Sequence, residues 1–571
     1  MRRFLTMLAL ATALLSRPAA EAATPSIGPV SIVFTGLVVD GEAIGRLGLS
    51  VDAETGETAY SGKVPDLRAP TDASWKSVEI SFDVADAADR FRFFWKLDAA
   101  EITDISYLQD GANDVIGILE NLRIGQASVP GGEFSFLPVD GTDPTLKGRH
   151  GRIWMTGMTG EKLGAASVSA IALTLSGSSS AGNGRADLDI AGASIAGLDI
   201  AYLASVGQQS EFAGGDFDDP SQLADVIETF ARQRTGYDSL AIDGIRSKAL
   251  IDLESFAFAI DHIGSSGVHG LRQGPSSVRG ASVRMDGGVA LGFAEAYWSG
   301  VDLTEPAIEI AELLRTRPEL FEASGNDDLA LLRAFPAFDL GKGGIRSLSV
   351  NPGKPDPLTV SAIRIDRMAM GEDGKFRFDL AIEGTDLPKN LMEGGDLDVL
   401  VRMLDHVEAP SLAGDFSLAL VTDVENRSVV LENVRLSADS LARVELDADL
   451  VIPEGASRER GVAASLDFLR FRIEDDRLFD ALFAVRDDTG APLMPSPEEI
   501  IQQLRGMQAM MNTDPGRTVY DDLIAFIDGA PNLEMKLAPQ QPVALEQLGG
   551  ILLLGADAAI QFLGLELRVW D

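Results

Sequence analysis

Histidines are the first residues to test for chemistry, because imidazole serves as a metal ligand and as a general acid or base. The chain has four of them, at His150, His262, His269 and His406. Only His262 and His269 lie close together, seven residues apart in a segment with strand and turn signals. Zinc takes three or four His, Cys or carboxylate ligands, so Glu254 or Asp261 would have to complete a site. A pair of surface or packed histidines is the simpler interpretation.

Acidic turns are candidates for calcium, which prefers oxygen ligands. The densest, at 216–219, reads Asp-Phe-Asp-Asp after two glycines. It lacks the loop glycine of an EF-hand, and Ile227 stands where the twelfth-position Glu should be. Segment 182–187 is similar to glycine–aspartate calcium repeats, but it occurs once and out of register. Asp219 is better explained as a helix cap, so we predict no metal site and no cofactor.

Catalytic motifs give no stronger signal. A G-x-S-x-G nucleophile elbow does not occur, and Pro336 stands where a phosphate-binding loop ending at Lys342 would need its first glycine. The 87 acidic residues could supply a carboxylate pair for glycoside hydrolysis, but aromatic residues, which sugar sites use for stacking, are only 6% of the chain. Acidic pairs such as 475–476 and 487–488 are typical of solvated turns. We therefore predict no catalytic, cofactor-binding or metal-binding residue.

The elements that would have to position any site are mostly strands. Segments 78–84, 376–382 and 444–452 alternate apolar and charged residues with period two, as in antiparallel sheets with one wet face. Within 466–473 the apolar phase shifts between Phe468 and Leu469, which predicts a β-bulge or a change of sheet face. We predict a mainly β fold with interspersed helices (α+β), elongated and built from repeated antiparallel sheet units.

Helices are fewer and have recognisable starts. One begins at Asp219-Pro220, and Thr304 can cap the next. Residues 496–499, Ser-Pro-Glu-Glu, form a capping box with proline at the first helical position. A further helix is expected from about Lys389 to His406. The apolar stripes of these helices are expected to face the core.

Spacing along the chain indicates repeats. Three helix starts fall about 84 residues apart, and Gly-Ile-Arg-Ser at 244–247 recurs at 344–347. The predicted organisation is a signal peptide at 1–22, an N-terminal β-rich region at 23–215, tandem strand-plus-helix repeats at 216–410, and a C-terminal β-rich region with helices at 411–571.

The N-terminus predicts export. Arg2 and Arg3 precede the apolar run 4–15, and Ala20-Glu21-Ala22 forms a small-residue cleavage site, so cleavage is expected before Ala23. An uncleaved anchor is the alternative, but a spanning helix needs about 20 apolar residues and this run has 12. The expected location is the periplasm or the medium.

Charge and cysteine usage exclude several classes of partner and chemistry. Forty-eight basic against 87 acidic residues give a net charge of −39, which disfavours nucleic acid and anionic membrane surfaces as partners. The absence of cysteine excludes disulfides, thiol catalysis and lipidation at an N-terminal cysteine.

Residues 240–300 and 340–455 have the sequence pattern of successive amphipathic strands, for example 431–436 followed by 442–446. In this the chain resembles the AsmA-like envelope proteins and their uncharacterised proteobacterial relatives. The resemblance implies a long β-groove that holds lipid acyl chains in the periplasm or supports outer-membrane assembly. The chain departs from that family by lacking a convincing N-terminal membrane anchor, so a bridge tethered to the inner membrane is not expected.

The resulting functional expectation is an exported envelope protein without catalysis that binds lipid or another apolar ligand. Apolar side chains of 444–452 would line the groove, and Glu445, Asp447 and Asp449 would lie in water. The alternative is a structural or interaction protein of the envelope whose strand faces form a closed β core. A hydrolase and a calcium-binding protein are less favoured.

Overall fold

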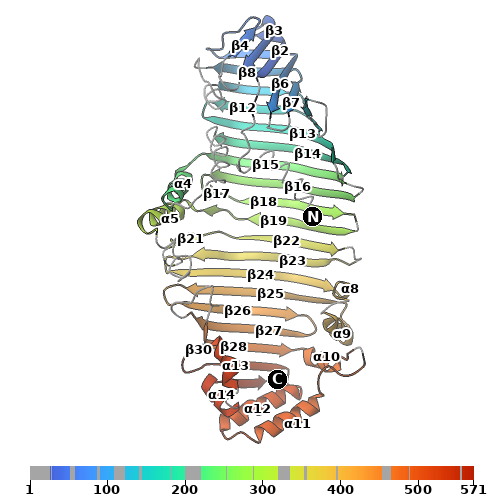
Figure 1. The fold of residues 1–571 in the computed structure, drawn as a ribbon, viewed down its shortest axis with the longest axis vertical. Coiled ribbons are helices and arrows are strands. Elements are labelled where there is room, and N and C mark those ends of the chain that lie inside the picture. Colours follow the sequence, from blue (N-terminus) through green and yellow to red (C-terminus); the bar gives the residue numbers. More distant parts are fainter. Residues whose placement is uncertain are drawn as a thin grey trace. The chain divides into compact units, whose positions relative to one another are not determined.

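Antiparallel strands dominate the structure (Figure 1), which confirms the predicted mainly β fold with interspersed helices. The computed structural model describes residues 26–27, 29–51, 58–85, 90–107, 122–139, 145–179, 182–199, 220–251, 254–286, 288–318, 333, 335–352, 356–393, 397–452, 464–487, 489–552 and 556–570. The predicted signal peptide and the acidic turn 216–219 lie outside these residues. The chain forms two compact units, one of residues 1–219 and 230–286, the other of 220–229 and 287–571.

The first unit is a run of antiparallel strands. Its strands are β1 (Ser26–Ile27), β2 (Val30–Val39), β3 (Glu42–Val51), β4 (Thr58–Ser61), β5 (Thr71–Trp75), β6 (Ser77–Ala85), β7 (Arg90–Leu97), β8 (Ala100–Tyr107), β9 (Leu122–Val129), β10 (Gly132–Pro138), β11 (Thr145–His150), β12 (Ile153–Thr159), β13 (Lys162–Ser179), β14 (Gly182–Asp199), β15 (Gly236–Ile251), β16 (Glu254–His269), β17 (Arg272–Gln273) and β18 (Ser276–Met285). Four couples of strands are each the two halves of one longer strand with a short break, namely β5 and β6, β7 and β8, β9 and β10, and β11 and β12. The unbroken β13 spans both halves, pairing with β12 through its first part and with β11 through its second.

An enclosed core lies at the N-terminal end of this unit. Leu37, Leu47 and Val78 are nearly inaccessible there, and Trp75 packs edge-on against Phe34 with ring centroids 5.5 Å apart. Farther along, from β13 to β18, most apolar side chains are only half-buried. The first unit therefore has a closed core at one end and a sheet with accessible faces beyond it.

The second unit continues the strand pattern and adds helices. Its elements are the first part of α4 (Pro220–Arg232), β19 (Val289–Trp298), β20 (Val301–Asp302), α5 (Thr304–Thr316), β21 (Phe338–Asp339), β22 (Gly343–Pro352), β23 (Leu358–Met370), β24 (Lys375–Pro388), α8 (Lys389–Met392), α9 (Asp398–His406), β25 (Ser411–Asp423), β26 (Ser428–Ala438), β27 (Ala442–Val451), β28 (Ser465–Asp475), α10 (Leu478–Ala484), α11 (Pro497–Gln508), α12 (Asp514–Ile527), β29 (Asn532–Leu537), β30 (Val543–Ala544), α13 (Leu545–Leu552), α14 (Ala556–Leu563) and β31 (Glu566–Trp570). From β22 to β29 each strand pairs with the next, and β31 then pairs with β29.

Most helix predictions are confirmed, with two corrections. Helix α4 begins at Pro220, and the Ser496 capping box is complete, with both of its hydrogen bonds present. Thr304 is the first helical residue rather than the cap, and its N–H donates to the Asp302 carboxylate at 3.1 Å. The single helix expected from Lys389 to His406 is two helices, α8 and α9. Among the helices in the described ranges, none has the length and apolar character that crossing a membrane requires.

The bulge predicted in 466–473 is present. Asp449 pairs with Phe468 and Leu450 pairs with Leu466, so Asp467 is the extra residue of β28. One inserted residue reverses the side-chain alternation, which places Leu466 and Leu469 on the same face.

The repeated tetrapeptide does not mark equivalent positions. Gly244 stands in the middle of β15 with φ +62°, whereas Gly344 lies at the start of β22 and Ser347 has the left-handed φ there, at +54°. The match therefore comes from similar strand composition, and the tandem-repeat boundaries stay a prediction.

Candidate functional site

One face of the second unit carries a continuous apolar row. Cross-strand pairing aligns one apolar residue from each of nine strands, which are Ile345, Ile363, Ile382, Phe416, Leu436, Val444, Ile473, Leu533 and Val569. Directly paired residues of neighbouring strands lie on the same face, with Cβ atoms about 5 Å apart. The register therefore builds an apolar band across the strands from β22 to β31.

This band is accessible over its first strands and covered at its last. From Ile345 to Phe416 its side chains are half-buried, and Leu436 is 52% exposed. At the other end Ile473 and Leu533 are buried beneath Phe479 of α10 and Phe526 of α12. The two phenylalanine rings meet edge to face with centroids 5.0 Å apart. Only the β22–β26 part of the band is thus available to a ligand.

The predicted face of β24 has the expected composition but not the expected burial. Phe376, Phe378, Leu380 and Ile382 alternate along the strand and share one face, and Phe378 pairs with Met368 and Leu420. None of the four is fully buried, although Phe376 packs against the small Met370–Val424 cluster. The sheet face is therefore apolar without being a closed core at this position.

The opposite face of the second unit forms a ladder of ion pairs. Glu445 was expected in water but is half-buried, 3.1 Å from Arg435 and 3.7 Å from Arg472. Asp447 accepts the Asn433 N–H at 2.9 Å. Burial, and then the charges of Asp467 and Asp447, raise the pKa of Asp449. Glu445 and Asp447 thus each have an arginine of a neighbouring strand within 4 Å, whereas Asp449 lies near other carboxylates.

Glu534 of β29 is a largely enclosed carboxylate of this ladder. It accepts hydrogen bonds from Arg470 and Arg472, both at 2.9 Å, and its side chain is 16% exposed. Burial alone would raise its pKa, but the two guanidinium groups outweigh burial and hold the pKa of Glu534 below its usual value.

Replacing Glu534 with Gln is expected to lower the free energy of unfolding at neutral pH by about 1–3 kcal/mol, because two arginines lose a charged acceptor. The folded-state pKa lies below the unfolded value of about 4.3. The contribution is therefore complete above that pH and is lost as pH falls through the folded-state pKa. Urea unfolding at a series of pH values measures the size of this contribution and its dependence on pH. If the difference in free energy of unfolding between wild type and variant does not shrink in acid, this role is contradicted.

The first unit also has an apolar face. One row consists of Ile80, Trp95, Phe134, Gly148, Leu173, Leu188, Ser247, Phe258 and Val283. His150 is 8% exposed. Its Nε2 accepts the Trp95 indole N–H at 3.0 Å and its Nδ1 donates to the Gly151 carbonyl at 2.8 Å. This histidine is a packed residue with both ring nitrogens satisfied.

The other histidines each face a different aspartate. His262 lies 2.6 Å from Asp243, and His269 lies 3.5 Å from Asp238. His406 lies 3.1 Å from Asp480. Among the described residues, no three His, Cys, Asp or Glu side chains come together in an arrangement that could hold a metal ion.

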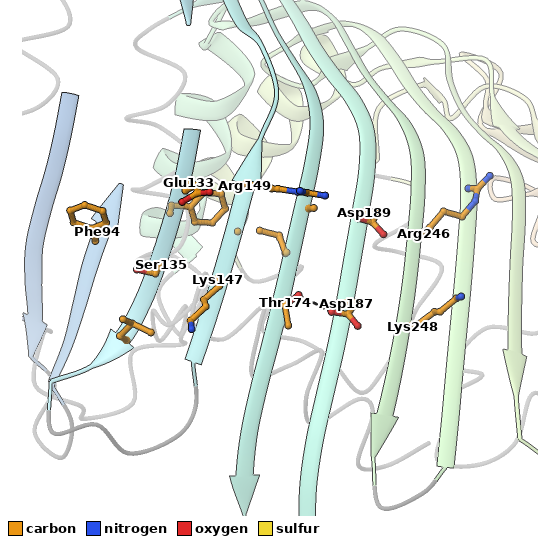
Figure 2. Close-up of a pocket in the computed structure, with 15 residues that line it drawn as sticks. Phe94, Glu133, Ser135, Lys147, Arg149, Thr174, Asp187, Asp189, Arg246 and Lys248 are labelled. Atoms are coloured by element: carbon orange, nitrogen blue, oxygen red, sulfur yellow. Dashed lines mark hydrogen bonds between the residues drawn. The ribbon is translucent and has the colours of Figure 1, made fainter. Parts of the chain in front are cut away.

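A polar hollow of about 790 Å³ lies on the other face of the first unit (Figure 2). Its charged lining residues come from four strands, namely Glu133 from β10, Lys147 and Arg149 from β11, Asp187 and Asp189 from β14, and Arg246 and Lys248 from β15. Segment 182–187, weighed for calcium, lies inside strand β14. Its Asp187 accepts hydrogen bonds from Thr174 at 2.7 Å and Arg185 at 3.0 Å.

Sequence reasoning did not single out the residues of this hollow. The signal was present, since Lys-Gly-Arg at 147–149 and Arg-Ser-Lys at 246–248 each place two basic residues on one face of a strand. Two such segments are separated by almost a hundred residues, and only the strand register shows that they line one surface.

Residues 416–569 match a family described only as an uncharacterized protein. This segment runs from the middle of β25 to β31 and includes the helices that cover the end of the apolar band. Comparison with curated proteins and with solved structures found no match.

Proposed function

We propose that this chain is an exported protein of the bacterial envelope that holds a lipid acyl chain, or a similar apolar ligand, against the β22–β26 part of its apolar band. It acts without catalysis, either as a binding or carrier protein or in support of outer-membrane assembly. Export through cleavage before Ala23 belongs to the proposal and is checked by N-terminal sequencing of protein recovered without detergent.

The observation that carries the proposal is the accessible part of the band, from Ile345 through Ile382 to Leu436. Apolar contact contributes about 0.8 kcal/mol for each methylene removed from water, so an acyl chain lying across several strands needs no specific polar contact. This also accounts for a binding surface without a recognisable sequence motif.

A second function is favoured by the covered end of the same band. Phe479 and Phe526 close over Ile473 and Leu533 as the core of an ordinary domain would. If ligand-free protein were the functional form, the chain would be a structural or interaction protein of the envelope with a closed core. Protein purified without detergent separates the two, because organic extraction and mass spectrometry detect a bound lipid only in the first case.

Replacing Ile382 with Asp is expected to weaken binding of a fluorescent fatty acid by about tenfold or more, because the acyl chain would have to desolvate a carboxylate. Ala381→Asp is the matched control. It adds the same charge on the opposite face, beside Arg364 and Ser417, and should leave binding unchanged.

The polar but uncharged variant Ile382→Thr provides a second test in case Ile382→Asp does not fold. Far-UV circular dichroism monitors the folding of each variant in parallel. Ile382→Thr should reduce affinity while the protein stays folded. Equal binding by Ile382→Asp and Ala381→Asp would show that this face does not hold the ligand.

A further inference from the structure

The polar hollow of the first unit contains charged side chains without partners. Lys147, Arg149, Asp189 and Lys248 are exposed, and none forms a hydrogen bond or ion pair with a described residue. Glu133, which also lines the hollow, likewise forms no hydrogen bond or ion pair with a described residue through its side chain. In a chain with a net charge of −39, carboxylates are more abundant than basic groups, so lysine and arginine side chains without an ion-pair partner around one concavity call for an explanation.

The strand register separates the cations of β11 from the carboxylates of β14. Lys147 stands opposite Thr174, and Arg149 stands opposite Ala172, so the cations of β11 face uncharged residues on β13. The carboxylates follow on β14, where Asp187 pairs with Thr174 and Asp189 with Ala172. Two strand spacings, about 9–10 Å, therefore separate the β11 cations from the β14 carboxylates.

Opposite charges also stand in register on the outer sides of this gap, Glu133 opposite Arg149 and Arg246 opposite Asp189. Neither couple forms an ion pair in the described structure, and Arg246 instead binds Asp261 at 2.6 Å.

The ladder of the second unit is the internal comparison. There Glu445, Arg472 and Glu534 stand on adjacent strands, and the charges approach to between 2.9 and 3.7 Å. Between β11 and β14 of the hollow, the uncharged positions of β13 separate the opposite charges. The result is a gap with a cationic side and an anionic side, floored by Ala172 and Thr174.

The close-up shows the same order. Figure 2 places Thr174 between Lys147 on one side and Asp187 on the other, with Arg149 and Asp189 farther along the same strands. Asp187 is already held by Thr174 and Arg185, which leaves Asp189 as the free carboxylate of the anionic side.

We propose that this hollow binds a small zwitterion, in which a phosphate or carboxylate group is joined through a few bonds to an ammonium group. The anionic group contacts Lys147 and Arg149, and the ammonium group contacts Asp189. A purely anionic ligand would leave Asp189 without a partner, and a purely cationic one would leave Lys147 and Arg149 without one. The site is independent of the proposed acyl-chain surface, because it lies in the other unit and on a polar face.

Phosphoethanolamine has this chemistry and occurs in two forms, as a soluble molecule and as a lipid headgroup. Ligand-observed NMR titration of the full protein with O-phosphoethanolamine, inorganic phosphate and ethanolamine tests the chemistry. O-phosphoethanolamine should bind at least about fivefold more tightly than either fragment, because it satisfies both sides of the gap at once. Cosedimentation with phosphatidylethanolamine and with phosphatidylcholine vesicles then distinguishes the lipid headgroup from the soluble molecule. If only phosphatidylethanolamine vesicles retain the protein, the ligand is the lipid headgroup.

Single substitutions assign the contacts. Arg149→Gln should weaken O-phosphoethanolamine binding by about fivefold or more. Arg284→Gln is the matched control and removes the same charge from the same face. Arg284 pairs with Ala257, which pairs with Lys248, but Arg284 does not line the hollow. This substitution should change affinity by less than about twofold. Asp189→Asn should remove the preference for O-phosphoethanolamine over phosphate while phosphate still binds.

Three results would overturn the proposal. These are equal affinity for O-phosphoethanolamine and phosphate in the unaltered protein, equal weakening by Arg149→Gln and Arg284→Gln, and no saturable binding of any of the three probes. Because all the substituted side chains are exposed, none of these outcomes can be attributed to loss of folding.

Discussion

Leu404→Ala is expected to lower the free energy of unfolding of the α9–α10 region by about 3 kcal/mol, within the range of about 2–5 seen for fully buried leucines. Leu404 has no exposed surface and packs among Met392, Leu441 and Ala481. This cluster fastens α8, α9 and α10 to the strand ends of the second unit. Truncation leaves a cavity that rigid strand ends fill poorly, which adds to the loss of apolar burial.

Hydrogen-exchange mass spectrometry measures this locally, by reading the protection of peptides from α9 and α10. Val399→Ala on the same helix is the control, because Val399 is 38% exposed. Its effect should stay within about 0.5 kcal/mol. Similar losses of protection in the two variants would mean that the helix is not anchored through Leu404.

Gly414→Ala is expected to destabilise the second unit by about 1–3 kcal/mol or more. A Cβ at this position of β25 would overlap the backbone carbonyl oxygen of Ser437 on the neighbouring β26. The contact involves backbone, so no side-chain rotation relieves it. The next residue, Asp415, accepts the Gly384 N–H at 2.6 Å, and displacing β25 would strain that bond too.

Gly506→Ala is the matched substitution with the opposite expected sign. Gly506 lies exposed in the last turn of helix α11, with no atom within 4 Å of an added Cβ. Alanine there should raise stability by up to about 1 kcal/mol, because glycine is a poor helix former. Thermal unfolding of the two variants in parallel tests both signs, and a stable Gly414→Ala variant would show that β25 and β26 can separate at little cost.

The apolar band and the ion-pair ladder together explain how a sheet with two accessible faces stays folded. Each strand exchanges main-chain hydrogen bonds with two neighbours, and its side chains add apolar pairs on one face and charge pairs on the other. Enclosed cores are needed mainly where helices or strand ends meet, as around Leu404 and Trp75.

Local rules were enough to predict several elements from the sequence. The alternation in 376–382 predicted the shared face of β24, because side chains of a strand point to opposite sides in turn. The phase shift after Phe468 predicted the bulge at Asp467. The Ser496 capping box predicted the start of α11, because its hydrogen bonds join residues three apart.

Tertiary structure decided everything that depends on which strand lies beside which. The half-buried state of Phe378, the pairing of Glu445 with Arg435 and Arg472, and the separation of Lys147 from Asp187 by Thr174 all depend on which strands are neighbours. A period-two pattern shows which residues share a face, but it is equally compatible with a covered and an accessible face. Coverage and charge pairing arise between different strands and helices, so their energies are absent from the pattern of any single strand.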